Sequence, residues 1–101
     1  MKVKIEFQYF EGCPNHQRMY QILEEAIVGL HDKLEVNRIL VNSLETAQQV
    51  QFRGSPTMLI NGKDLEDMPP PASPALACRY YPHGLPTVSM LREKILQQLA
   101  Q

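Results

Sequence analysis

Apolar and polar side chains alternate at the start of the chain. Val3, Ile5, Phe7 and Tyr9 are apolar or aromatic, and the residues between them are charged or polar. A period of two is typical of a β-strand with one buried face. The pattern therefore predicts a first strand over residues 3–9.

The spacing changes to that of a helix at Cys13-Pro14. Proline suits the first helical turn, because its missing N–H would have no partner there. Apolar residues then recur at helical spacing: Met19, Tyr20, Leu23, Ile27 and Leu30. We expect a helix that begins at Cys13-Pro14 and ends at about His31.

A strand, a helix and a hairpin are predicted in the middle of the chain. Apolar and β-branched residues indicate a strand over residues 34–41, and Asn42-Ser43 marks the start of a short helix that ends near residue 53. The apolar stripe of this helix is Leu44, Ala47 and Val50. A compact apolar segment predicts a third strand over residues 57–60. Asn61-Gly62 is the strongest two-residue hairpin motif, so we expect a short return strand over 63–66.

The segment over residues 67–86 is irregular and rich in proline: Pro69, Pro70, Pro71, Pro74, Pro82 and Pro86. Proline excludes a regular helix or a central strand here. A loop of this length is uncommon in a compact domain and is usually functional or mobile. It carries Cys78. A last helix follows over residues 87–99, with one apolar face: Val88, Leu91, Ile95 and Leu99.

The predicted order is β-α-β-α-β-β-loop-α. Two strands joined by a helix form a parallel unit, and the hairpin adds antiparallel strands. We therefore expect an α/β fold with a mixed central sheet of about four strands and helices on both faces. A chain of 101 residues is expected to form one domain over residues 1–101.

Charge and composition narrow the possible partners. The formal net charge is −1, and acidic and basic residues are interleaved. The sequence has no clustered basic face of the kind that binds nucleic acid. It also has no apolar run long enough to span a membrane, so we expect neither nucleic acid nor a membrane as a partner. Charges at Lys2, Lys4 and Glu6 interrupt the apolar stretch that a signal peptide needs, so we expect a cytoplasmic protein.

Cys13 is the first candidate for chemistry. It lies between a strand end and a helix start, where partial positive charge stabilises a thiolate over a thiol. His16, one turn later, could add positive charge, carry a proton or act as a metal ligand. The alternative without chemistry is that Cys13 is a small, buried apolar residue and that His16 is a solvated helix residue.

Two motifs resemble the thioredoxin superfamily. Gly12-Cys13-Pro14-Asn15-His16 is similar to its Cys-x-x-Cys motif, and Ser55-Pro56-Thr57 is similar to its cis-proline and the strand that follows. The resemblance covers most of the chain and implies a thioredoxin-like fold. It also implies that Pro56 lies against Cys13 in a cis peptide bond and that the backbone of Ser55 meets the substrate.

The chain departs from this pattern at His16, which stands in place of the second cysteine. Three possibilities follow: a monothiol that acts through mixed disulfides, resolution by Cys78, or a different task for the thiol. Arg79 beside Cys78 would favour a thiolate. Alternatively, Cys78 is a small apolar residue that pins the loop to the core together with residues 75–77, and Tyr80 and Tyr81 pack the loop down.

The chain also resembles, faintly, the organomercurial (alkylmercury) lyases. Cys13 and Cys78 would match the two cysteines of that family, whereas His16 stands where its carboxylate would be. Two cysteines and a histidine form a reasonable ligand set for a soft metal ion.

The sequence thus favours a thiol-dependent redox protein without a cofactor. Its expected catalytic residues are Cys13, His16 and Cys78, and its expected substrate-binding residues are Ser55, Pro56 and Pro14. The expected partner is a protein with a disulfide or a small thiol. The alternatives are a soft-metal site at Cys13, Cys78 and His16, and a thioredoxin-fold interaction module without turnover.

Overall fold

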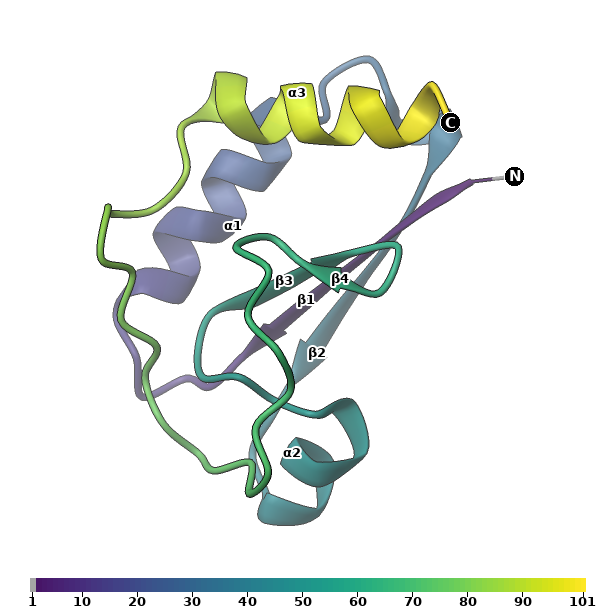
Figure 1. Cartoon of the computed structure of the whole chain (residues 1–101). Helices are drawn as coiled ribbons and strands as arrows, with labels where there is room; N and C mark the ends of the chain where they lie inside the picture. Colours follow the sequence, from purple (N-terminus) through teal and green to yellow (C-terminus); the bar gives the residue numbers. More distant parts are fainter. Residues whose placement is uncertain (1) are drawn as a thin grey trace.

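The computed structural model describes residues 2–101, which form seven helices and strands and one short 3₁₀ turn (Figure 1). In chain order they are β1 (Val3–Tyr9), α1 (Asn15–Ala26), the 3₁₀ turn η1 (His31–Lys33), β2 (Leu34–Leu40), α2 (Leu44–Val50), β3 (Thr57–Ile60), β4 (Lys63–Asp64) and α3 (Val88–Leu99). Over the described part of the chain, no helix has the length and apolar character needed to cross a membrane.

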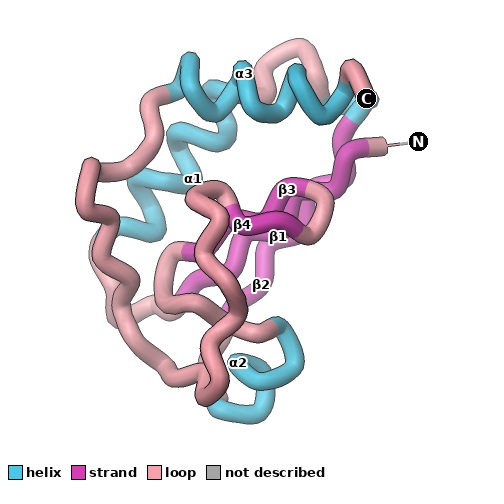
Figure 2. Tube along the Cα trace, viewed as in Figure 1, coloured by secondary structure: helices cyan, strands magenta, loops and turns pink. Residues whose placement is uncertain are grey.

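The strands form one mixed sheet in the order β2-β1-β3-β4 (Figure 2). β1 and β2 are parallel, with Val3 opposite Leu34, and β3 is antiparallel to both β1 and β4. Asn61, at the hairpin turn, has a positive φ of 51°, a conformation that asparagine tolerates better than most residues. The predicted α/β fold with about four strands and a mixed sheet is confirmed.

The main core lies between the sheet and the helices α1 and α3. Alternate residues of β1 point into it, as the period of two predicted, and one face of each of these two helices contributes as well. Its fully buried members include Ile5, Phe7, Met19, Leu23, Leu91 and Ile95. Burying such side chains is the main source of stability in a domain of this size.

A second, smaller core lies on the opposite face of the sheet. Val41, Ala47 and Phe52 form this cluster, and the partly buried Ile39 packs against it from β2. Gln8 also points to this face from β1 and is fully buried; its Nε2 donates to the carbonyl of Val50 at the end of α2, at 3.2 Å. Helix α2 therefore covers this face, and the expectation of helices on both faces is confirmed.

Two hydroxyl side chains fix the helix starts that the sequence predicted. Ser43 Oγ accepts from the backbone N–H of Thr46 at 3.1 Å, and Thr87 Oγ1 accepts from that of Met90 at 3.1 Å. Each bond satisfies an N–H group that has no partner inside the helix.

Several expected boundaries or faces differ from the structure, among them the end of α2, which lies at Val50 rather than near residue 53. Helix α1 ends at Ala26 rather than near residue 31, because the chain turns at Gly29 with a φ of 81°. β4 stops at Asp64, since the backbone turns away from β3 after that residue. Leu44 is 57% exposed, so it does not belong to the apolar stripe of α2.

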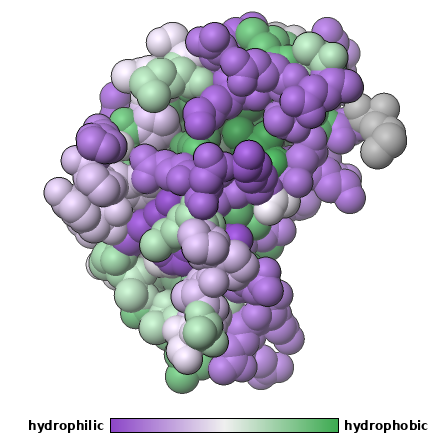
Figure 3. Space-filling view, in the orientation of Figure 1, coloured by the Kyte–Doolittle hydropathy of each residue, from purple (hydrophilic) through white to green (hydrophobic). Residues whose placement is uncertain are grey.

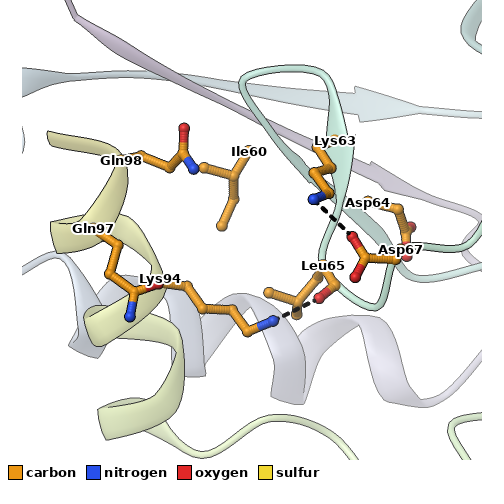
Figure 4. A pocket seen from close by; sticks show the side chains of 8 residues that line it. All are labelled: Ile60, Lys63, Asp64, Leu65, Asp67, Lys94, Gln97 and Gln98. Carbon is orange, nitrogen blue, oxygen red and sulfur yellow. Dashed lines mark hydrogen bonds and ion pairs between the residues drawn. The ribbon is translucent and has the colours of Figure 1, made fainter. Parts of the chain in front are cut away.

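Polar contacts fasten α3 to the hairpin and to α1. Lys94 Nζ donates to the carbonyl of Leu65 at 3.0 Å, across a pocket between α3 and the β3–β4 hairpin (Figure 4). Arg92 Nη1 donates to the carbonyls of Ala26 and Val28, at 2.9 and 2.8 Å. The positive charge of Arg92 thus lies at the C-terminus of α1, where it is favourable.

We expect Leu91→Ala to lower the free energy of unfolding by about 2–5 kcal/mol, because it leaves a cavity in the main core. Leu96→Ala, on the same helix but at a position 42% exposed, is the matched control and should change stability by less than about 1 kcal/mol. Urea denaturation measures both. Equal losses would contradict the packing of α3 described above.

Candidate functional site

Cys13 and Cys78 form a disulfide in this structure. They are 65 residues apart in sequence, and their Cα atoms are 5.6 Å apart. Cys13 lies in the turn between β1 and α1, and its N–H donates to the carbonyl of Phe10 at 3.2 Å. Cys78 lies in the long loop between β4 and α3, so the bond joins this loop to the start of α1.

The backbone of Ser55 holds the loop beside Cys13. Its N–H donates to the carbonyl of Ala77 at 2.8 Å, and its carbonyl accepts from the N–H of Arg79 at 2.9 Å. Ser55 and Cys78 thus form an isolated parallel bridge. The Oγ of Ser55 also accepts from the N–H of Phe10 at 2.8 Å. One residue therefore connects the turn before Cys13 to the segment around Cys78.

The peptide bond between Ser55 and Pro56 is cis, and both residues are buried. The carbonyl of Pro56 accepts a hydrogen bond from the hydroxyl of Tyr81. Burial raises the pKa of this hydroxyl, so that it stays protonated and able to donate. Tyr81 packs the loop down as expected, whereas Tyr80 is 82% exposed and does not.

A buried ion pair fixes the loop next to Cys78. Arg79 donates to both carboxylate oxygens of Asp64, at 2.7 and 2.8 Å, and the two side chains are 4% and 1% exposed. Asp64 also accepts from the backbone N–H groups of Glu66 and Met68. Burial raises the pKa of the Asp64 carboxyl, but these hydrogen bonds outweigh it, so the net shift is downward.

This pairing changes the role expected for Arg79. The guanidinium is bound to a carboxylate and lies over the ring of Tyr81, 4.7 Å from its centroid, instead of serving chiefly as a free positive charge for Cys78. Gly54 makes the arrangement possible. Its φ is 98°, and a Cβ there would lie 2.9 Å from the Cβ of Arg79.

His16 is buried, which excludes the alternative of a solvated helix residue. It is 7% exposed, in the first turn of α1, and its ring stacks on Tyr9 with centroids 5.0 Å apart. The guanidinium of Arg38 lies over the rings of Tyr9 and Tyr20, at 4.7 and 4.2 Å. The Nδ1 atom of His16 is buried and has no hydrogen-bond partner within residues 2–101.

The structure thus joins Cys13 and Cys78 by a disulfide, and Ser55 connects the segments around both cysteines by hydrogen bonds. Pro56 follows Ser55 through the cis peptide bond. Pro14 is exposed at the start of α1. The alternative in which Cys78 pins the loop as a small apolar residue does not hold, because Cys78 is exposed; Leu76 packs on the α2 cluster instead. Among the described residues, no group of three or more histidine, cysteine or acidic side chains is arranged to hold a metal ion.

Asp64 was not among the expected site residues, although it holds the loop. The only sequence feature that distinguishes Asp64 is its position just after the hairpin turn, 15 residues before Arg79. Nothing in that spacing predicts a contact, because the long loop between the two residues has no regular structure from which a distance could be inferred.

The order of the elements, the mixed sheet, and a disulfide-bonded cysteine at the start of the first helix together indicate a thioredoxin-like fold. Among solved structures, this chain is similar to chloroplastic thioredoxin z, with a TM-score of 0.66 and 20% sequence identity. The match covers 99% of this chain and 80% of the other. No family model matches the chain, and no curated protein sequence does. The likeness confirms the fold that the two motifs implied.

Reducing the disulfide should destabilise the protein. It closes a loop of 65 residues, and the chain-entropy estimate for such a loop is about 4 kcal/mol of unfolding free energy. We expect thermal unfolding with and without a reductant to differ accordingly, and a 2 Da mass increase on reduction. An unchanged melting temperature, with both thiols shown to be free by alkylation, would contradict this expectation.

Asp64→Asn should lower the free energy of unfolding at pH 7 by about 3–5 kcal/mol, because it leaves the buried guanidinium without a charged partner. The folded-state pKa of Asp64 lies below its ordinary value of 3.8. The stability that it contributes is therefore present above about pH 4 and is lost as the pH falls further.

Denaturation of the two proteins between pH 7 and pH 2 tests this expectation. The variant should lack the Asp64 part of the acid loss, so the two stability curves should approach each other below pH 4. Asp67→Asn is the matched control, since the Asp67 side chain is 69% exposed in a surface pair with Lys63. Parallel curves for wild type and Asp64→Asn would refute the assignment.

Proposed function

We propose that this protein is a thiol–disulfide exchange protein that cycles between the Cys13–Cys78 disulfide and the dithiol. The observation that carries the proposal is the bond between the two cysteines, one at a helix start and one in a loop held by Ser55. The thioredoxin-like fold supports it as an analogy. A disulfide of this kind in the cytoplasm would be a working bond that forms and breaks.

Cys13 is the nucleophile toward the substrate in this proposal. It precedes α1, a helix of 12 residues, whose free N–H groups and dipole stabilise a thiolate. His16 is the proposed proton carrier. Its buried Nδ1 atom without a partner supports this role, since a buried ring nitrogen normally has a hydrogen bond.

The exchange balances in two steps. The Cys13 thiolate attacks one sulfur of a substrate disulfide, forms a mixed disulfide and releases the other substrate sulfur as a thiolate. The Cys78 thiolate then attacks Cys13 Sγ and releases the first substrate sulfur, leaving the Cys13–Cys78 disulfide. The substrate gains two electrons and the protein loses two. The proposed partner is a protein or small molecule that contains a disulfide.

Ser55, Pro56 and Pro14 are the proposed substrate contacts. In the disulfide form, both polar backbone atoms of Ser55 are already bonded to the loop, at Ala77 and Arg79. A substrate that pairs with the backbone of Ser55 would therefore have to displace the loop. The loop can be displaced only in the dithiol form, in which Cys78 is no longer bonded to Cys13.

A soft-metal site is the second candidate, because the structure brings the two sulfur atoms within bonding distance of each other. Reduced Cys13 and Cys78 could share one soft ion such as mercury(II). This function needs both thiolates at once, whereas exchange needs one attacking sulfur.

We expect Cys13→Ser to abolish reduction of a glutathionylated peptide, and Cys78→Ser to keep the first step but accumulate the mixed disulfide on Cys13. Mass spectrometry of timed samples measures both. His31→Ala, an exposed histidine outside the site, is the control for His16→Ala, which should slow the Cys13 step by about tenfold or more.

A parallel titration with mercury(II) and zinc(II) of the reduced protein separates the two candidates. One-to-one binding that is lost in either cysteine variant, together with no exchange activity in the wild type, would refute the proposal and favour the metal site. Turnover that survives Cys13→Ser would refute the role of Cys13.

A further inference from the structure

The two cysteines of the disulfide differ in their exposure to solvent. Cys13 is 1% exposed, whereas Cys78 is an exposed residue. Cys78 also lines a shallow groove between the end of α2 and the long loop. Other residues that line this groove include Phe52, Arg53, Met68, Pro71 and Ala77.

The visible face of the molecule differs in polarity from one region to another (Figure 3). In Figure 3, strongly polar side chains gather over the upper right, around α3 and the hairpin, whereas weakly polar and apolar side chains cover much of the lower left, where the loop runs. Met68, which lines the groove, is 44% exposed. The groove that Cys78 lines is therefore open and mostly apolar.

We infer that the thiol which reduces this protein attacks Cys78 Sγ and that Cys13 is the leaving group. The inference rests on the proposed function. It assigns a different sulfur atom to each of the two half-reactions. Cys13 attacks the oxidised substrate, and Cys78 receives the reducing thiol.

Access is the first reason. Attack on a disulfide occurs at one sulfur, in line with the bond that breaks, so the attacking thiolate must reach that sulfur from outside. Cys13 is enclosed by the turn that precedes α1 and by the loop segment paired with Ser55. Cys78 borders the groove.

The leaving group is the second reason. A thiol that is more stable as a thiolate leaves faster, and the sulfur that leaves in this reaction is that of Cys13, at the N-terminus of α1. Attack on Cys13 would instead expel Cys78, which has no helix start beside it and whose neighbour Arg79 is bound to Asp64. Both reasons select the same sulfur.

The step balances as follows. A thiolate RS⁻ forms a bond to Cys78 Sγ while the bond between Cys78 and Cys13 breaks, and the electron pair of that bond leaves on Cys13 Sγ. A second RS⁻ attacks the sulfur of the R group in this mixed disulfide, forms RSSR and releases Cys78 as a thiolate. Two thiols are oxidised, and the protein gains two electrons.

The decisive experiment uses oxidised wild-type protein and reduced glutathione. Samples are quenched in acid at short times and digested with pepsin at low pH, where thiol exchange is slow, and the glutathione adduct is located by mass spectrometry. We expect the adduct on the Cys78 peptide and a free thiol on the Cys13 peptide. An adduct on Cys13, alone or in equal share, would overturn the inference and leave the exchange function intact.

If neither glutathione nor dithiothreitol reduces the disulfide in the folded protein, the exchange function itself is refuted, and the inference with it. The two failures are therefore distinguishable in one experiment.

A charge placed in the groove tests the route. Ala77 is exposed beside Cys78, so Ala77→Glu should slow reduction by anionic glutathione by about two- to threefold and speed reduction by cationic cysteamine by a similar factor. Val28→Glu, at a position 62% exposed at the end of α1, is the matched control and should change neither rate. Equal rates for Ala77→Glu and Val28→Glu with both thiols would contradict entry through the groove.

Discussion

The ion pair between Asp64 and Arg79 is the constraint on which the candidate site depends. The loop that leaves β4 contains six prolines and has no helix or strand of its own, so few backbone bonds hold it in place. A carboxylate at the end of β4 accepts two bonds from the guanidinium of Arg79 and two more from the backbone at the start of the loop. Both ends of the loop segment before Cys78 are thereby fixed to one edge of the sheet.

A buried ion pair has a large desolvation cost, which its hydrogen bonds must offset. Here every carboxylate oxygen of Asp64 has at least one donor, and the ring of Tyr81 covers the guanidinium. The pair therefore gives the loop one position instead of many. That position brings Arg79 and Ala77 against the backbone of Ser55, and it brings Cys78 to Cys13. The ion pair thus holds the loop in the position in which the two cysteines, 65 residues apart in the sequence, are bonded.

In a Cys-x-x-Cys motif, the same few residues place both cysteines. Here the two cysteines are placed by different parts of the chain. Cys13 is placed by a helix start, which depends only on local sequence, whereas Cys78 is placed by a loop, which depends on the sheet edge. Since the loop also pairs with Ser55, the position of the loop and the redox state of the cysteines are linked. A change at Asp64, far from either sulfur in sequence, would act on both.

Local periodicity determined most of the fold. The alternation of residues 3–9, the serine and threonine caps of α2 and α3, and the Asn61-Gly62 turn each act over a few residues, so the sequence contains all the information that they need. The end of α1 and the exposure of Leu44 were predicted wrongly, because a turn at Gly29 and the packing of α2 overrode the apolar spacing.

The features of the candidate site also fall into two groups: those set by neighbouring residues and those set by the tertiary structure. The sequence by itself determined that Cys13 lies at a helix start and that Ser55-Pro56 precedes a buried strand, since both follow from neighbouring residues. Only the tertiary structure decided that Cys78 is bonded to Cys13, that Arg79 binds Asp64 and that His16 is buried. Each of these contacts joins segments through an irregular loop or across the sheet, and its distance is set by the packing of the whole chain.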